Sequence, residues 1–398
     1  MNAVSELKQL VIDETDQQAA TEAARAAAFD VLIAAITERR DEFDRIKHIP
    51  RDIVALMKKA GIFRASTPRL FGGDALAPHK FLGYIERIAT ADGSAAWVAA
   101  FGSANTYLAA LPIETQRHIY ASGPDQVYAA GLYPVQPAEA VDGGWRATGR
   151  WKFASGCMGA DWIGVGIQGA PRPAGEPPAP VMMAICPADE VEIVENWDVV
   201  GMQGTGSHDT RVENKFYASD WTCARGAPGL VDEPLNRYPT LAYQAQVHAA
   251  CNIGLARAAI DLAVAAGGGA KIMPGAARLA DRAYFRSEIA KCEARWRSAR
   301  MFFYDAAERA WDAIEAGDKV SVELDNELRL SATHAAHTSA EVVQVAYRIS
   351  GMGSIHKANR MQQIVRDTMV VTQHASLSES TYEATGGYFA KVDKGLAQ

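Results

Sequence analysis

The stretch that decides the fold lies near the C-terminus and reads GMGSIHKANRMQQIVRDTMVVTQHA, from Gly351 to Ala375. Its two closely spaced glycines, Gly351 and Gly353, permit a close approach of the backbone to a ligand or to another chain segment. An Arg-Asp pair at 366–367 is followed by His374 and then by Ala375. Histidine changes its charge near neutral pH, whereas alanine cannot take a proton. The stretch therefore offers an imidazole as its proton-handling group.

Composition narrows the class of protein. The chain has 398 residues, of which 48% are hydrophobic and 22% charged, so a protein of two or three packed modules is expected. The formal net charge of −7 argues against nucleic acid as a partner, because such a partner requires a basic face. Five widely spaced cysteines without a Cys-x-x-Cys motif indicate a reducing, cytoplasmic compartment. Neither a signal peptide nor a membrane helix is expected.

Hydrophobic periodicity divides the chain into three parts. Residues 1–125 carry apolar residues at helical spacing and predict an N-terminal helical domain, in which a run of small residues predicts one buried helix over 95–110. Residues 126–235 hold short β-prone runs separated by turn signals, which predict an antiparallel sandwich or barrel. Residues 236–398 return to the helical period and predict a four-helix bundle, one helix of which covers 322–349. The fold class is thus α+β with several domains. The predicted strands are 126–132, 145–154, 161–168, 181–186, 191–197 and 210–217.

This three-part order, with five local motifs, resembles the acyl-CoA dehydrogenase superfamily over nearly the whole chain. The motif Gly149–Gly156 (GRWKFASG) is similar to the flavin-contacting β-segment of that superfamily, and Gly201–Asp209 (GMQGTGSHD) to a β-domain loop. The remaining motifs are Leu70–Gly73, Asp92–Trp97 and the C-terminal stretch Gly351–Ala375.

The C-terminal motif also indicates a branch of the superfamily. In its dehydrogenases a Tyr-Glu pair follows Arg-Asp at a fixed spacing, and the Glu is the catalytic base. Here those two positions fall on His374 and Ala375, which resembles the two-component flavin monooxygenases. The resemblance implies that reduced FAD or FMN from a separate flavin reductase reacts with O2, through a hydroperoxide on the flavin ring, to hydroxylate a small aromatic substrate. It also implies a homotetramer. No strand–Gly-x-Gly-x-x-Gly–helix unit that binds nicotinamide nucleotides is present in the sequence.

The same resemblance implies roles for two catalytic residues. Ser155 occupies the position of a hydroxyl beside flavin N5, and His374 that of the histidine near the reacting oxygen. Without the resemblance, Ser155 is a strand serine bonded to backbone and His374 a buried core histidine.

Further residues are candidates for holding the flavin. Thr205 and Ser207 offer hydroxyls in a glycine-rich loop whose amides suit an anion. Trp197 precedes this loop and is a candidate for flanking the flavin ring, or else a core tryptophan. Gly351 and Gly353 permit close approach, and Arg366 is a candidate for the flavin phosphate or belongs to a solvated basic face.

The residues expected to contact the substrate differ from those of the phenol-hydroxylating members of the family. Those members carry a histidine in the helix that here reads FGSANTY (Phe101–Tyr107), which contains none. Asn105 or Tyr107 is left to supply a hydrogen bond to the substrate. A phenolate site is therefore less favoured, and a neutral heterocycle such as an indole becomes a candidate.

Two other readings stay open on the sequence. Tyr382-Glu383 resembles the dehydrogenase Tyr-Glu pair, although it lies eight residues too late, and a shifted register would make Glu383 the base of an acyl-CoA dehydrogenase. A helical scaffold without flavin is the second alternative. No metal site is expected, because His334-x-x-His337 lacks a third ligand at a fitting spacing.

Overall fold

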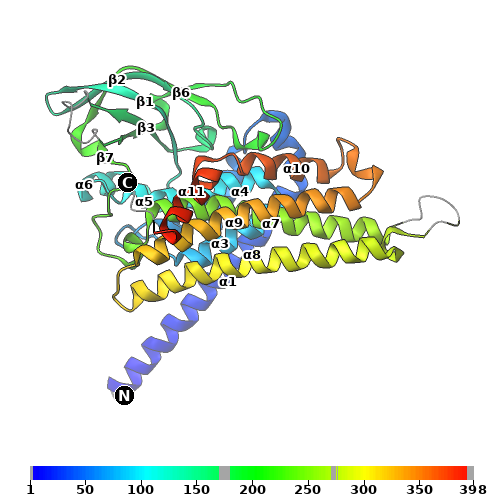
Figure 1. Ribbon diagram of the computed structural model, residues 1–398. Helices are drawn as coiled ribbons and strands as arrows, with labels where there is room; N and C mark the ends of the chain where they lie inside the picture. The colour runs from blue at the N-terminus through cyan, green and yellow to red at the C-terminus, as the bar shows by residue number, and fades with distance from the viewer. Residues whose placement is uncertain (1–2, 170–179, 270–274, 276, 392–398) are drawn as a thin grey trace.

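The computed structural model describes residues 3–169, 180–269, 275 and 277–391. Two helical regions pack together beneath a β region, so the three-part architecture predicted from the sequence is confirmed (Figure 1). The helices of the N-terminal region are α1 (Ala3–Ile46), α2 (Arg51–Lys59), α3 (Pro78–Ala91), α4 (Gly93–Ala100), α5 (Asn105–Leu108) and α6 (Ile113–Ile119).

Helix α4 lies at the centre of the molecule. Asp92 begins it, because its side chain accepts a hydrogen bond from Ala95 N at 2.8 Å. Every residue of α4 is buried, and apart from Trp97 and Val98 its side chains are small. The sequence predicted one helix over 95–110, but the structure breaks it after Ala100 into a 3₁₀ turn and the short helix α5.

The β region is a seven-stranded sheet in the order β5-β6-β2-β1-β3-β4-β7. The sheet stays open, so the barrel given as one of the two expected forms is not closed, and the sheet is mixed rather than antiparallel because β1 and β3 run parallel. Strand β1 is long. Residues 128–137 pair with β3, with a register shift between Gly131 and Gln136, and residues 138–141 pair with β2. The strands are β1 (Tyr128–Val141), β2 (Gly144–Trp151), β3 (Trp162–Gln168), β4 (Met182–Pro187), β5 (Glu192–Val194), β6 (Asp209–Ala218) and β7 (Thr222–Ala224).

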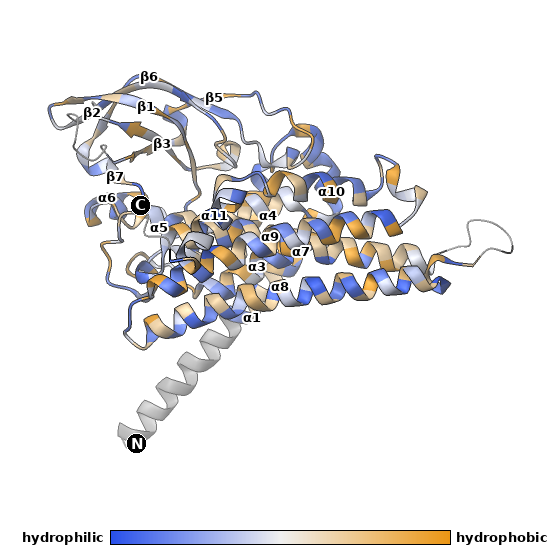
Figure 2. Cartoon of the chain, in the orientation of Figure 1, coloured by the Kyte–Doolittle hydropathy of each residue, from blue (hydrophilic) through white to orange (hydrophobic). Residues whose placement is uncertain are grey.

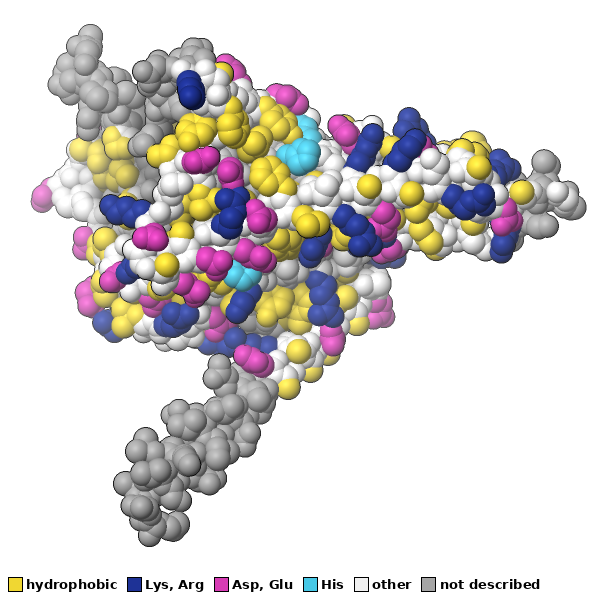
Figure 3. Space-filling view, turned by 60° about the horizontal axis from the view of Figure 1, so that its bottom comes forward, with side chains coloured by type: hydrophobic (Ala, Val, Ile, Leu, Met, Phe, Trp, Pro, Cys, Tyr) yellow, Lys and Arg dark blue, Asp and Glu magenta, His cyan; other side chains and the backbone are white. Residues whose placement is uncertain are grey.

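The C-terminal region contains the four predicted helices and a fifth, α11. They are α7 (Thr240–Gly268), α8 (Ala283–Glu315), α9 (Val322–Ile349), α10 (Arg360–Val371) and α11 (Glu379–Phe389). Hydrophilic and hydrophobic residues alternate along α8, as in an amphipathic helix (Figure 2). Acidic and basic side chains are intermixed over the face drawn in Figure 3. Among the described residues, α7 alone is long and apolar enough to cross a membrane, yet 67% of that window is buried inside the fold.

One loop ties the three regions together. Asp367 of α10 accepts a hydrogen bond from Met202 N at 2.6 Å, and Ser94 of α4 accepts one from Gly204 N at 3.1 Å. The loop needs glycine at 201, because an added Cβ there would lie 2.4 Å from the carbonyl oxygen of Arg366. These contacts hold the loop between β5 and β6 against α4 and α10.

Candidate active site

Three buried hydroxyl groups form a chain where the β region meets α4. Ser155 Oγ lies 2.6 Å from Ser207 Oγ, and Ser207 Oγ lies 2.7 Å from Thr205 Oγ1. Trp97 of α4 donates from Nε1 to Ser155 Oγ at 3.2 Å, and Thr205 donates to the carbonyl of Met202 at 2.9 Å. The three hydroxyls predicted as cofactor ligands are therefore brought together by hydrogen bonds with one another.

A stack of rings continues from Trp97. The ring of His248 on α7 stacks on Trp97 at 4.1 Å between centroids, and the ring of His374 lies 4.5 Å from His248. Trp97 also meets His374 edge-on at 5.5 Å, and Phe101 meets His248 edge-on at 6.2 Å. His374 thus lies close to the hydroxyl chain, connected to it through Trp97. It lies after the end of α10, in extended backbone.

Both imidazoles of this stack are held neutral. Burial lowers the pKa of His374 to about 4, with a further contribution from the positive charge of Arg225. Burial also lowers the pKa of His248 well below its usual range, and the neighbouring His374 adds to this effect. No carboxylate of the described residues forms a hydrogen bond or ion pair with the His374 ring.

The contacts of His374 also assign its tautomer. Its Nδ1 lies 2.7 Å from Ser376 Oγ and accepts a hydrogen bond from Ser376 N at 3.4 Å. A neutral imidazole that accepts at Nδ1 carries its proton on Nε2. Among the described residues none bonds to Nε2, so His374 presents an N–H donor.

A cation and two tyrosines lie near His374. Arg225 follows β7, and its Nη1 donates to the hydroxyl of Tyr133 at 3.2 Å. The Arg225 side chain also hydrogen-bonds to Tyr107, whose pKa is raised by burial. Tyr107, predicted as a substrate contact, is therefore placed beside a charged group that the sequence did not single out.

An exposed aromatic pair borders the hydroxyl chain. Phe153 is 63% exposed and is held at a φ of +63°, a conformation that is rare for a side chain of this size. Its ring meets the half-buried ring of Trp197 edge-on at 6.2 Å, and Trp197 donates from Nε1 to Met202 O at 3.1 Å. An apolar platform next to hydroxyl groups suits a flat polycyclic ligand with polar edges.

Other predicted residues lie elsewhere. Asn105 is fully buried, and its amide donates to Phe63 O at 2.6 Å and to Thr67 Oγ1 at 3.1 Å, which ties a turn of the N-terminal region to α5. Gly351 and Gly353 precede α10 while His374 follows it, a separation of roughly 18 Å along a 12-residue helix.

The side chain of Arg366 makes no hydrogen bond to the three hydroxyls among the described residues, although its backbone lies against Gly201 of the same loop. It is close to Asp44 of α1, a carboxyl whose pKa is raised by burial and lowered by the charge of Arg366. An added Cβ at Gly353 would meet nothing within 4 Å, so that glycine faces open space in the single chain.

Glu383 is exposed on α11. Within the described residues it makes no hydrogen bond or ion pair with the ring stack or the hydroxyl chain. A carboxylate that removes a substrate proton must lie against the substrate and the cofactor. The position of Glu383 therefore does not support the dehydrogenase reading.

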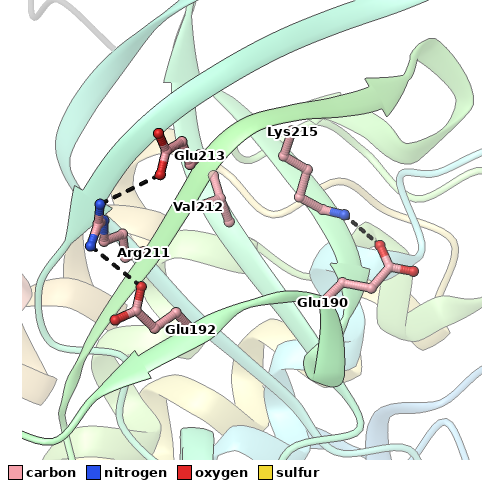
Figure 4. A pocket seen from close by; sticks show the side chains of 6 residues that line it. All are labelled: Glu190, Glu192, Arg211, Val212, Glu213 and Lys215. Atoms are coloured by element: carbon pink, nitrogen blue, oxygen red, sulfur yellow. Dashed lines mark hydrogen bonds and ion pairs between the residues drawn. The ribbon is translucent and has the colours of Figure 1, made fainter.

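A hollow on the outer face of the sheet lies apart from this site (Figure 4). It is lined by Glu190, Glu192, Arg211, Val212, Glu213 and Lys215. Its cations are already paired, since Lys215 contacts Glu190 while Arg211 lies 3.6 Å from both Glu192 and Glu213.

Comparison with known proteins decides the family. Residues 15–121 match the family model of the acyl-CoA dehydrogenase N-terminal domain, and residues 246–379 match that of the C-terminal domain. The indole-3-acetate monooxygenase of Pseudomonas putida is 46% identical over 92% of this chain and 94% of its own length. The chain belongs to the flavin-dependent monooxygenase branch of the acyl-CoA dehydrogenase superfamily.

Other relatives of this monooxygenase agree. The indole-3-acetate monooxygenase of Acinetobacter baumannii is 39% identical over 91% of this chain and 93% of its own length. The crystal structure of 3-HSA hydroxylase from Rhodococcus sp. RHA1 superposes with a TM-score of 0.85 at 25% identity, covering 92% of this chain and 97% of that one.

The site fits the reduced flavin that the family implies. The platform of Phe153 and Trp197 offers apolar faces, and the hydroxyls of Ser155, Ser207 and Thr205 offer partners for ring nitrogens and oxygens. These five residues would hold the flavin ring.

Sequence reasoning missed His248 and Arg225. His248 lies in a nearly continuous apolar helix, and Arg225 in a short polar segment after a three-residue strand. Neither carries a local pattern, because each reaches the site only through tertiary packing. Phe153 was not singled out, although it lies inside the motif Gly149–Gly156. The motif that contains Trp97 was the one available signal near His248.

Proposed function

We propose that this monooxygenase is the oxygenase component of a two-component system that hydroxylates a small heteroaromatic substrate of the indole type. The observation that carries the proposal is the composition of the ring stack. Ala375 stands where a dehydrogenase requires a carboxylate base, and the neutral imidazole of His374 precedes it. Two relatives that align over more than nine-tenths of the chain are named for an indole substrate.

Reduced flavin, when bound, supplies the two electrons that activate O2, so that one oxygen atom enters the substrate and the other leaves as water. The protein's own groups position and protect this chemistry. Ser155 has Trp97 as a donor and Ser207 as a partner, so its hydroxyl is oriented before any ligand arrives.

His374 contributes a hydrogen bond. Its Nε2–H is the free donor of a ring that is neutral at physiological pH, so it donates a hydrogen bond to an oxygen atom without bringing a positive charge to it. The stacked rings of Trp97 and His248 border this donor with apolar surface, which excludes water from the reacting atoms.

Partners follow from the proposal. Reduced FAD or reduced FMN comes from a separate flavin reductase, because the sequence shows no nicotinamide-binding fingerprint. We propose a cytoplasmic homotetramer. The free, buried state of all five cysteines supports a reducing compartment, and the open surroundings of Gly353 leave room for a neighbouring subunit.

Rapid mixing tests the proposal. Anaerobic protein with reduced FMN or FAD is mixed with oxygenated buffer, and the flavin spectrum is followed with and without indole-3-acetate. We expect a transient absorbance that belongs to neither reduced nor oxidised flavin, shortened in His374→Ala. Direct return to oxidised flavin, together with bleaching of bound oxidised flavin by an acyl-CoA, would reject the proposal in favour of dehydrogenation.

A further inference from the structure

The guanidinium of Arg225 lies near the ring stack, and the proposed oxygenation does not use it. Arg225 is exposed in the single chain and forms no ion pair with any carboxylate of the described residues. By contrast, Arg211 on the outer face of the sheet lies between two glutamates. A cation that is left without a counter-ion next to an active site is a recognition group for an anion.

The position of Arg225 is fixed by its neighbours. Its backbone N–H donates to Val181 O at 2.9 Å, which holds the start of the segment after β7 against the sheet. Its Nη1 donates to Tyr133 OH at 3.2 Å, and the guanidinium carbon lies 5.8 Å from the centre of the Tyr133 ring. A hydrogen bond to Tyr107 completes the arrangement. Two hydroxyls and one cation therefore converge on a single place.

The same place adjoins the catalytic histidine. The charge of Arg225 lowers the pKa of His374, so the two side chains lie within electrostatic reach of each other. Arg225 approaches from the β region, whereas Tyr107 belongs to α5 and His374 to the segment after α10. Three separate elements thus contribute the cation, Tyr107 and His374 to one region of the molecule.

We propose that Arg225, assisted by the hydroxyls of Tyr107 and Tyr133, binds the carboxylate of an arylacetate substrate and so orients its ring against His374. The proposal rests on the proposed function, because it assigns a substrate contact within the same site. A guanidinium presents a planar fork of donors that matches a carboxylate in two parallel hydrogen bonds. The charged pair fixes both the position and the direction of the aromatic ring relative to the reacting oxygen.

A matched pair of ligands tests this assignment. Indole-3-acetate and indole-3-acetamide have nearly the same shape, but only the acid carries a charge. Binding of each is measured by equilibrium dialysis under argon with saturating reduced flavin, and turnover is measured in parallel with O2. We expect the wild-type protein to bind the acid on the order of 10- to 100-fold more tightly than the amide, as for hydrogen bonds to charged groups.

Three variants separate charge from structure. Arg225→Gln is expected to remove the preference for the acid while leaving amide binding unchanged, and Arg225→Lys to restore part of it, because lysine keeps the charge and loses the fork. Arg211→Gln is the matched control. It is expected to leave the binding of both ligands unchanged, since Arg211 lies in the hollow of Figure 4. Arg225→Gln is also expected to raise the pKa of His374, seen as a shifted histidine titration.

Each contrary result has its own meaning. An equal loss of acid and amide binding in Arg225→Gln, or an unchanged preference, overturns the assignment. Weaker binding of reduced flavin with an unchanged acid-to-amide ratio also overturns it, because Arg225 would then serve the flavin phosphate. If Arg225→Gln does not fold, the wild-type protein decides by itself. Equal binding of the acid and the amide by the wild type then overturns the assignment. The proposed function fails separately if the wild type oxygenates neither ligand.

Discussion

The neutral state of His374 has a measurable consequence for stability. In the unfolded chain a histidine takes up a proton near pH 6.5, whereas burial lowers the pKa of His374 to about 4 in the fold. Between these two pH values the imidazole of His374 is protonated in the unfolded chain but stays neutral in the folded protein. The stability contributed by this neutral ring is therefore complete above pH 6.5 and is lost as the pH falls toward 4. Linkage converts the shift to about 2 kcal/mol lost between pH 7.5 and pH 5.

Urea unfolding of the wild type and of His374→Asn measures this contribution. Asparagine cannot titrate, and comparing the two proteins cancels the effects of titrating groups that lie away from His374. We expect the wild type to lose about 2 kcal/mol more than the variant between pH 7.5 and pH 5. A histidine titration by NMR gives the pKa directly. Equal losses in both proteins, or a His374 resonance that titrates near pH 6.5, would refute the reasoning.

Three further substitutions test the hydroxyl chain, the tie loop and the alternative base. Ser155→Ala leaves the Nε1 of Trp97 without its acceptor, so we expect a loss of about 1–3 kcal/mol in chemical denaturation and weaker binding of reduced flavin. Gly201→Ala places a Cβ 2.4 Å from the carbonyl oxygen of Arg366 and should lower stability by about 1–3 kcal/mol, measured by thermal unfolding. Glu383→Gln should leave turnover within twofold of the wild type, roughly the effect of a surface substitution, and a total loss of turnover would revive the dehydrogenase mechanism.

The long periodic helices were predictable from the sequence. Helix α9 has the predicted bounds, Val322–Ile349, because Ser321 supplies an N-cap and the apolar period is uninterrupted. The break after Ala100 was not predicted, since the small residues on both sides of it favour one helix equally. Strand β7 was missed because three residues are too few to show alternation. The parallel pairing of β1 with β3 depends on which strands meet in space, and local turn signals do not encode that.

The residues of the candidate site also divide into those that the local sequence predicts and those that it does not. Ser155, Ser207 and His374 were candidates because each lies inside a motif that can be read along the chain. The roles of His248 and Arg225 depend on packing between α7, the segment after β7 and the end of α10, so neither residue has a signal in its own neighbourhood. The sequence also placed Asn105 among the substrate contacts, whereas its amide is occupied by backbone and side-chain acceptors of the N-terminal region. Burial of both its donors is decided by tertiary contacts.

The most direct test of the account follows the oxygen atom itself. The protein is given indole-3-acetate and chemically regenerated reduced flavin under ¹⁸O₂, with catalase present, and the product is analysed by mass spectrometry. We predict one heavy oxygen atom in the product of the wild type, and a large loss of this labelled product in His374→Ala. Product without label, or oxidised flavin and peroxide with no change in the indole, would contradict the claim that this chain is an aromatic oxygenase.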